Sequence, residues 1–219
     1  MKRKAIATFL IVWMFMAGLE MSAYAEEGFK CFFHMYKQVS SRGEEYGTRI
    51  YLHGKILEKV NSVSIKVPYH KKFIVENWLG FDGALFSTGN MTYEQFNRRF
   101  PEGKYIVTLF PSRYGKYSVD RYHDFPDLTV TYPVEDAVDV PRKPKIQWNP
   151  LTNVKMLTLR VETQWGSYGA SLDPETTSYT PYWTLDPNSE YTLYLEASSL
   201  DSRGNKTVTT QKVSFTTGK

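Results

Sequence analysis

The sequence predicts an all-β protein of two tandem β-sandwich domains, the first of which carries one short helix. Three observations support this prediction. Short runs of residues alternate between apolar and polar with a period of two, which is typical of half-buried strands. Pro and Gly recur between these runs, as they do at the turns of all-β proteins. A segment rich in proline and charge, residues 132–145, divides the chain into two halves that both show this pattern.

Residues 1–25 have the features of a cleaved secretory signal. A basic start is followed by an apolar run over residues 5–19, and small residues stand at Ala23 and Ala25. A membrane anchor is the alternative, but a run of about 15 residues is shorter than the roughly 20 that span a bilayer. We therefore expect cleavage after Ala25, a secreted or periplasmic protein, and no membrane span in the mature chain.

Charge and cysteine content narrow the class of protein further. The whole chain carries a formal charge of +4, and the signal accounts for three cations and one anion, so about +2 remains. This balance gives no reason to expect a nucleic-acid partner, which needs a dense basic face. The single cysteine, Cys31, is either a buried thiol or the site of an intermolecular bond. A secreted chain without internal disulfides is typical of bacteria.

The first domain is expected at residues 26–133. Alternation in "VSIKVP" (63–68), "KYIVTL" (104–109) and "DLTVTY" (127–132) predicts strands. One helix is predicted over residues 92–100, where Thr92 and Gln95 form a capping box and apolar residues recur on one face. Those residues are Tyr93, Phe96 and Phe100.

Residues 134–143 are predicted to be a linker, and residues 144–219 a second sandwich. Its strands are expected at residues 145–148, 157–165, 178–185, 191–198 and 208–217. In the third of these, Tyr179, Pro181, Trp183 and Leu185 take the inward positions. So many short strands bury their apolar stripes best as two sheets packed face to face.

Residues 144–218 resemble a fibronectin type III or immunoglobulin-like domain. The matching residues are Trp148, the spacing Leu185-x-Pro187-x-x-x-Tyr191, Ala197, Gly204-Asn205 and the closing "SFTT". The resemblance implies that the Tyr191 hydroxyl bonds to nearby backbone as a tyrosine corner, and that Leu185 and Trp148 fill the core. The chain has no Arg-Gly-Asp triplet, so integrin-type adhesion is not implied. The first half resembles N-terminal modules of uncharacterised secreted bacterial proteins, in "VSIKVP" and "RRFPEGKYIVTL", without an implied activity.

No catalytic set or metal-ligand spacing is found in the sequence. The four histidines, His34, His53, His70 and His123, are far apart along the chain. His123 stands beside Asp124 in a segment turned by Pro126, for which we expect a structural role. A G-x-S-x-G elbow and phosphate-binding loops are absent from the sequence. We therefore expect no metal, no cofactor and no enzymatic activity.

Exposed aromatic residues are the remaining candidates for function. Trp165, Tyr168 and Tyr182 are predicted to bind a ligand by stacking, with Gly166 and Gly169 allowing a loop to carry Tyr168 outward. The alternative is that Trp165 caps the core and that the tyrosines are ordinary surface.

We expect an exported, non-enzymatic binding or interaction protein, with a protein or glycan of the cell envelope or exterior as its partner. The alternative is a secreted hydrolase, or its accessory module, with its chemistry in the N-terminal domain. Three histidines converging with acids in one cleft would favour the hydrolase.

Overall fold

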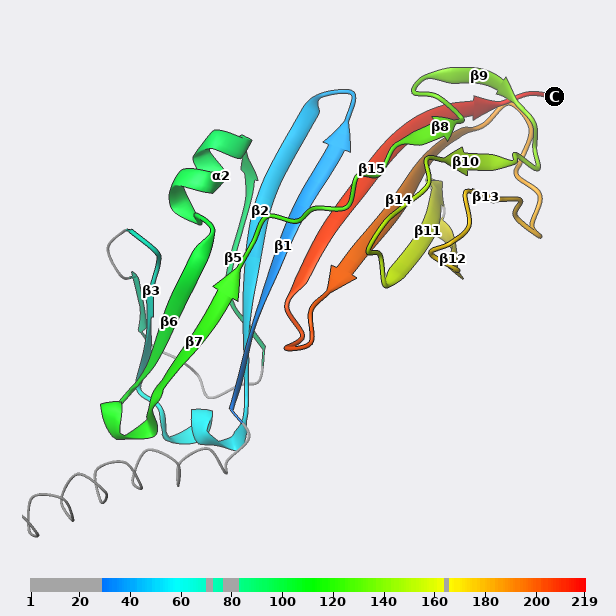
Figure 1. Ribbon diagram of the computed structural model, residues 1–219. Coiled ribbons are helices and arrows are strands. Elements are labelled where there is room, and N and C mark those ends of the chain that lie inside the picture. The colour runs from blue at the N-terminus through cyan, green and yellow to red at the C-terminus, as the bar shows by residue number, and fades with distance from the viewer. Residues whose placement is uncertain (1–28, 70–72, 77–82, 164–165) are drawn as a thin grey trace, which may run out of the picture. The chain divides into compact units, whose positions relative to one another are not determined.

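The computed structural model describes residues 29–69, 73–76, 83–163 and 166–219 (Figure 1). The predicted signal, residues 1–25, lies outside the described residues, so its cleavage stays a prediction. The described part consists mostly of strands, together with one short α-helix and two 3-10 turns. The all-β fold with one short helix is therefore confirmed.

The elements in chain order are these: β1 (Lys30–Ser40), β2 (Gly43–His53), η2 (Lys55–Lys59), β3 (Ser62–Lys66), β4 (Phe73–Glu76), β5 (Gly83–Met91), α2 (Tyr93–Arg99), β6 (Gly103–Phe110), η3 (Ser112–Tyr114), β7 (Lys116–Arg121), β8 (Val130–Tyr132), β9 (Ala137–Val140), β10 (Ile146–Trp148), β11 (Met156–Thr163), β12 (Gly166–Leu172), β13 (Ser178–Tyr179), β14 (Glu190–Leu200) and β15 (Lys206–Thr217).

The chain forms two compact units that alternate along the sequence. The smaller unit takes in residues 29–31 and 103–120 and the described residues of 51–85. The larger unit takes in residues 32–50 and 86–102 and the described residues of 121–219. The division into domains at residues 26–133 and 144–219 stays a prediction, for which a proteolysis test is given below.

The smaller unit contains a sheet in the order β4-β3-β6-β7. Strand β3 runs antiparallel to both β4 and β6. Val63 and Ile65 on β3 are fully buried, as are Tyr105 and Val107 on β6. The alternation seen in the sequence therefore marks the buried face of this sheet.

Helix α2 belongs to the larger unit and begins as predicted. The Thr92 hydroxyl accepts a bond from the Gln95 backbone N–H, and the Gln95 side chain accepts one from the Thr92 N–H, which completes the capping box. Phe96 and Phe100 are fully buried, whereas Tyr93 is half exposed. The apolar face is thus narrower than the sequence pattern indicates.

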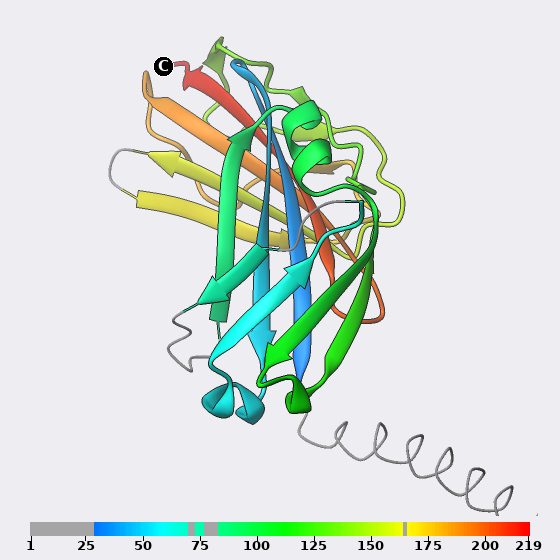
Figure 2. The ribbon, with the colours of Figure 1, turned by 90° about the vertical axis from the view of Figure 1, so that its left-hand side faces the viewer.

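The large sheet follows the order β12-β11-β14-β15-β1-β2-β5 and is the main sheet of the larger unit. β14 is antiparallel to both β11 and β15. β1 lies parallel to β15, with His34 opposite Lys206. The neighbouring order of β14 (orange), β15 (red) and β1 (blue) can be followed in Figures 1 and 2.

A second, three-stranded sheet, β13-β10-β8, completes the C-terminal sandwich of the larger unit. The residues of its core come from both sheets and include Ile146, Leu159, Leu193 and Phe215. The predicted inward positions Pro181, Trp183 and Leu185 are all buried. The C-terminal part is a β-sandwich of two sheets around one core, the fold that the resemblance implied.

The residues that we expected to form a linker contribute to this sandwich. β8 pairs with β10, and after Pro133 the chain crosses to the other sheet, where β9 pairs parallel to β15. The Glu135 carboxylate accepts a bond from the Ser214 N–H at 2.9 Å, and the Asp136 N–H donates to the Ser214 carbonyl at 2.8 Å. Prolines therefore stand between two short strands rather than in an extended spacer.

Candidate binding surface

Two of the three aromatic residues predicted to bind a ligand lie around the indole of Trp183. The Tyr168 ring, on β12, stacks on Trp183 with 5.4 Å between the ring centroids and 17° between the planes. Tyr182 meets the same indole edge-on, at 4.9 Å and 85°. Trp165, the third residue, lies outside the described residues. We call Tyr168, Tyr182 and Trp183 the aromatic cluster.

The aromatic cluster places two exposed rings on a buried one. Tyr182 is 82% exposed, Tyr168 is 45% exposed, and Trp183 only 9%. The Nε1 atom of Trp183 is buried and has no hydrogen-bond partner among the described residues. The packed indole supports both phenol rings, so a flat ligand can stack on them with little loss of side-chain freedom.

Tyr168 reaches the surface from a strand and not from the predicted glycine loop. Gly166 and Gly169 lie within β12, opposite Thr163 and Arg160 of β11. Tyr168 lies opposite the buried Val161, so its ring is on the core side of the sheet. It is exposed because β12 is the last strand of its sheet.

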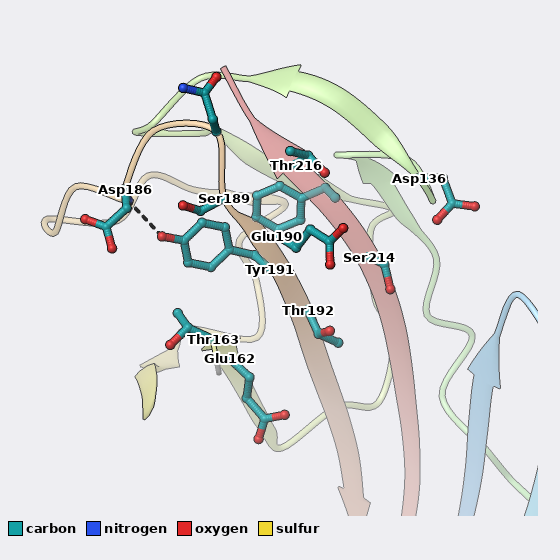
Figure 3. A pocket seen from close by; sticks show the side chains of 12 residues that line it. Asp136, Glu162, Thr163, Asp186, Ser189, Glu190, Tyr191, Thr192, Ser214 and Thr216 are labelled. Carbon is teal, nitrogen blue, oxygen red and sulfur yellow. Dashed lines mark hydrogen bonds between the residues drawn. The ribbon is translucent and has the colours of Figure 1, made fainter. Parts of the chain in front are cut away.

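A pocket of about 820 Å³ lies over the start of β14 and the end of β15 (Figure 3). Its residues come from these two strands, from the end of β11, from the loop before β14 and from the turn before β9. They are Asp136, Glu162, Thr163, Asp186, Asn188, Ser189, Glu190, Tyr191, Thr192, Ser214, Phe215 and Thr216.

The loop that borders the pocket is held by the predicted tyrosine corner. The Asp186 N–H donates to the Tyr191 hydroxyl at 2.8 Å (Figure 3). The Thr217 hydroxyl donates to the Asp186 carbonyl at 2.6 Å and accepts from the Ser189 N–H at 3.0 Å. The Tyr191 ring also stacks on Phe215, with 5.6 Å between centroids. These bonds fix the pocket wall before any ligand arrives.

The charge of the pocket lining is entirely negative. Asp136, Glu162, Asp186 and Glu190 supply four carboxylates, and the lining contains no Lys, Arg or His. Glu162 pairs with Arg160, whose guanidinium also lies 4.5 Å from the centroid of the Tyr194 ring. The other polar groups are hydroxyls of Ser and Thr and the amide of Asn188. The lining therefore offers mainly hydrogen-bond acceptors and disfavours anions.

The pocket borders β12, the strand that carries Tyr168. Glu162 and Thr163 of the pocket lining lie opposite Ser167 and Gly166 of β12. Burial raises the pKa of the Tyr191 hydroxyl, which lies in the same lining.

Sequence reasoning did not find these four carboxylates. Glu162 and Glu190 stand at outward positions next to the ends of predicted strands, which is the only signal that the sequence offers. Asp136 joins them because the expected linker folds onto β15. That long-range pairing has no signature in local sequence.

Among the described residues, Cys31 and His123 are of types that can act in catalysis, and both are packed against other parts of the chain. Burial raises the pKa of the Cys31 thiol to about 12, which makes it unreactive. His123 Nε2 lies 2.7 Å from the Phe100 carbonyl, with its ring packed against Phe96. Among the described residues, no group of three or more His, Cys, Asp or Glu side chains is arranged to hold a metal ion. His70 lies outside them.

Within the part of the chain that the structure describes, no helix has the length and apolar character needed to cross a membrane. No family model and no curated protein matches the chain.

Three solved structures are similar to the chain at low identity. The FN1-FN3 domains of chicken CNTN1 share 13% identity at a TM-score of 0.33, with 84% of this chain and 64% of that chain covered. The fibronectin(III)-like modules of Clostridium thermocellum CbhA share 11% at 0.29, with 83% and 89% covered. A structure of a 1.5-MDa bacterial ice-binding adhesin, described for host cell surface retention, shares 11% at 0.29, with 86% and 64% covered.

Proposed function

We propose that this chain is an exported, non-enzymatic binding protein that holds a glycan of the cell envelope or exterior on its C-terminal sandwich. The observation that carries the proposal is the aromatic cluster, in which Tyr168 and Tyr182 are exposed on the buried Trp183. A phenol ring covers the apolar face of a pyranose, and a ring that is already packed loses little freedom on binding.

The neighbouring pocket supports a glycan ligand and limits its charge. Carboxylates accept hydrogen bonds from sugar hydroxyls, and the Ser and Thr hydroxyls both accept and donate them. The four carboxylates repel uronic acids and phosphorylated polymers. We therefore expect a neutral or amino-substituted polysaccharide. Trp165, for which no position is described, remains a predicted member of the same surface.

Binding of the chain from Glu26 onward to a panel of polysaccharides tests this proposal. The panel contains neutral, amino-substituted and uronic-acid polymers, and affinity is measured by calorimetry or affinity electrophoresis. We expect binding to members of the first two classes, and a loss of about 3- to 10-fold in affinity for Tyr168→Ala and for Tyr182→Ala. Trp165→Ala is measured beside them.

Two variants serve as controls. Tyr182→Phe keeps the ring and should keep most of the affinity. Tyr69→Ala removes a tyrosine that is 93% exposed elsewhere in the chain and should change nothing. Unchanged affinity in folded Tyr168→Ala and Tyr182→Ala would remove the aromatic cluster as the site. Absence of binding to every polymer would instead favour a protein partner.

A further inference from the structure

The outer edge of β12 is long, regular and uncharged. Its seven residues, Gly-Ser-Tyr-Gly-Ala-Ser-Leu, pair with β11 at every position from Gly166 to Leu172 without a shift in register. β12 ends the large sheet, and no strand of the described residues pairs with its other side. The backbone N–H and C=O groups on that side form a ready template for another strand.

Other sheet edges of this chain carry the features that normally prevent strand pairing. β7 contains Lys116, Asp120 and Arg121. β8 is three residues long and is followed directly by Pro133, and β13 has only two residues. In β5, at the far end of the large sheet, Asn90 has a φ of 57° and interrupts the extended backbone. Charges, prolines, irregularities and short length all hinder edge-to-edge contact, and β12 has none of them.

We infer that β12 pairs antiparallel with β12 of a second copy of this chain. The strand is self-complementary about its middle residue, Gly169. In such a pair Tyr168 lies opposite Ala170 of the other copy, so a large side chain meets a small one. Ser167 lies opposite Ser171, and no like charges are brought together. A two-fold axis through Gly169 therefore joins two large sheets into one.

This pairing does not require the proposed glycan site, because it is made by the backbone groups of β12, and it covers the outer sheet edge beside Tyr168. Tyr168 lies opposite the buried Val161 on the core side of β12, whereas the new hydrogen bonds form in the plane of the sheet. Ser167 and Ser171 lie on the opposite side, where both are exposed. These two serines can be substituted without touching the core or the aromatic cluster.

Charge exchange at the two serines tests the inference. The mass of the chain from Glu26 onward is measured by sedimentation velocity and by light scattering, from about 1 μM to about 200 μM. We expect the wild type to reach twice the monomer mass. The double variant Ser167→Lys/Ser171→Lys places like charges opposite each other twice, and should raise the dimer dissociation constant at least about 10-fold.

The matched control is Ser167→Lys/Ser171→Glu, which places opposite charges across the same pair and should dimerise like the wild type. Circular dichroism establishes that each variant is folded. A wild type that stays monomeric at every concentration overturns the inference. A Lys/Lys variant that dimerises as well as the wild type places the interface elsewhere. A Lys/Glu variant that fails to dimerise contradicts the antiparallel register about Gly169.

Discussion

Two cores of the larger unit differ in how they are built. The core of the C-terminal sandwich consists of alternating apolar residues from paired strands, and its polar rings bond to backbone. Trp148 Nε1 donates to the Thr176 carbonyl at 2.8 Å, and the Tyr191 hydroxyl accepts from Asp186. The second core surrounds Phe96 of α2 and gathers rings from separate segments. Those rings are Tyr46, Tyr93, Phe100, His123 and Phe125.

The second core contains His123, a titratable residue for which the described part of the chain supplies a hydrogen-bond partner at only one of its two ring nitrogens. His123 Nε2 lies 2.7 Å from the Phe100 carbonyl, whereas the buried Nδ1 has no hydrogen-bond partner among the described residues. Among the described residues, the core of the C-terminal sandwich contains no histidine and no carboxylate. The core around Phe96 includes an imidazole whose neutral form is favoured by burial.

The largest effect is expected for Phe96→Ala. Phe96 is fully buried, and its ring centroid lies 4.9 Å from His123 and 5.8 Å from Tyr46. Loss of the ring leaves a cavity and should lower the free energy of unfolding by about 3 to 5 kcal/mol. Urea denaturation measures it. A loss below about 1 kcal/mol would mean that the aromatic core adds little to stability.

Leu185→Ala should act in the sandwich core with a similar or smaller effect. Leu185 is 1% exposed and belongs to the main apolar cluster. We expect a loss of about 2 to 5 kcal/mol through cavity formation. If Phe96→Ala and Leu185→Ala each shift the same single transition, the two cores unfold together. Two separate transitions would show that they are independent.

Tyr191→Phe removes the hydroxyl of the tyrosine corner but keeps its ring. The Asp186 N–H loses its partner, so we expect a loss of about 1 to 2 kcal/mol. Tyr194→Phe, on the opposite side of β14, is a matched control and should cost less. Equal stability of Tyr191→Phe and the wild type would show that water replaces the hydroxyl fully.

Acid should lower the stability of the larger unit through two histidines, one of which lies in the core around Phe96. Burial lowers the pKa of His123, and nearby Arg121 acts in the same direction, whereas the Phe100 carbonyl and Glu102 oppose them. The neutral imidazole is favoured in the folded state, so stability is present above the unfolded pKa of about 6.5 and is lost as pH falls through the lower folded pKa. Burial also lowers the pKa of His34, to about 4, so His34 contributes stability that is lost as pH falls from about 6.5 to about 4.

The free energy of unfolding, measured from pH 7 downward, should therefore fall less steeply in His123→Phe than in the wild type, and less still when His34→Gln is added. Parallel curves for wild type and both variants would show that carboxylates alone set the acid sensitivity.

Limited proteolysis of the wild-type chain tests the predicted division into two domains. Arg142 and Lys143 are exposed, so trypsin should cut there. Stable fragments near residues 26–140 and 144–219 that separate under native conditions would confirm two domains. Fragments that elute together would contradict the division, because strand pairing such as that of β9 with β15 would then hold them.

The sequence was sufficient to predict elements defined by local pattern. The capping box at Thr92 and the buried positions Ile65 and Leu193 follow from spacing within a few residues. Each of these needs only a strand or helix period and one neighbouring backbone group. The roles of Tyr191 and Leu185 were implied by the resemblance to fibronectin type III domains.

Long-range pairing was not predictable in the same way. The crossing of the chain after Pro133, which brings Asp136 to the pocket, depends on Ser214. The central place of Trp183 in the aromatic cluster depends on its stacking with Tyr168, which lies on a separate strand, β12. Period and propensity carry no information about partners so distant in sequence.

The parallel pair of β1 and β15 has a consequence for how the chain folds during its synthesis. The Phe33 N–H donates to the Asn205 side chain at 3.0 Å across 172 residues, and His34 lies opposite Lys206. During synthesis β1 is made before β15. The edge of β1 that pairs with β15 therefore stays uncovered until nearly all of the remaining residues have been made. Contacts between residues so far apart in sequence slow folding, and until they form the unpaired edge of β1 is exposed to aggregation. A chain truncated before β15 should therefore depend on a chaperone to stay in solution, even if its N-terminal half is folded.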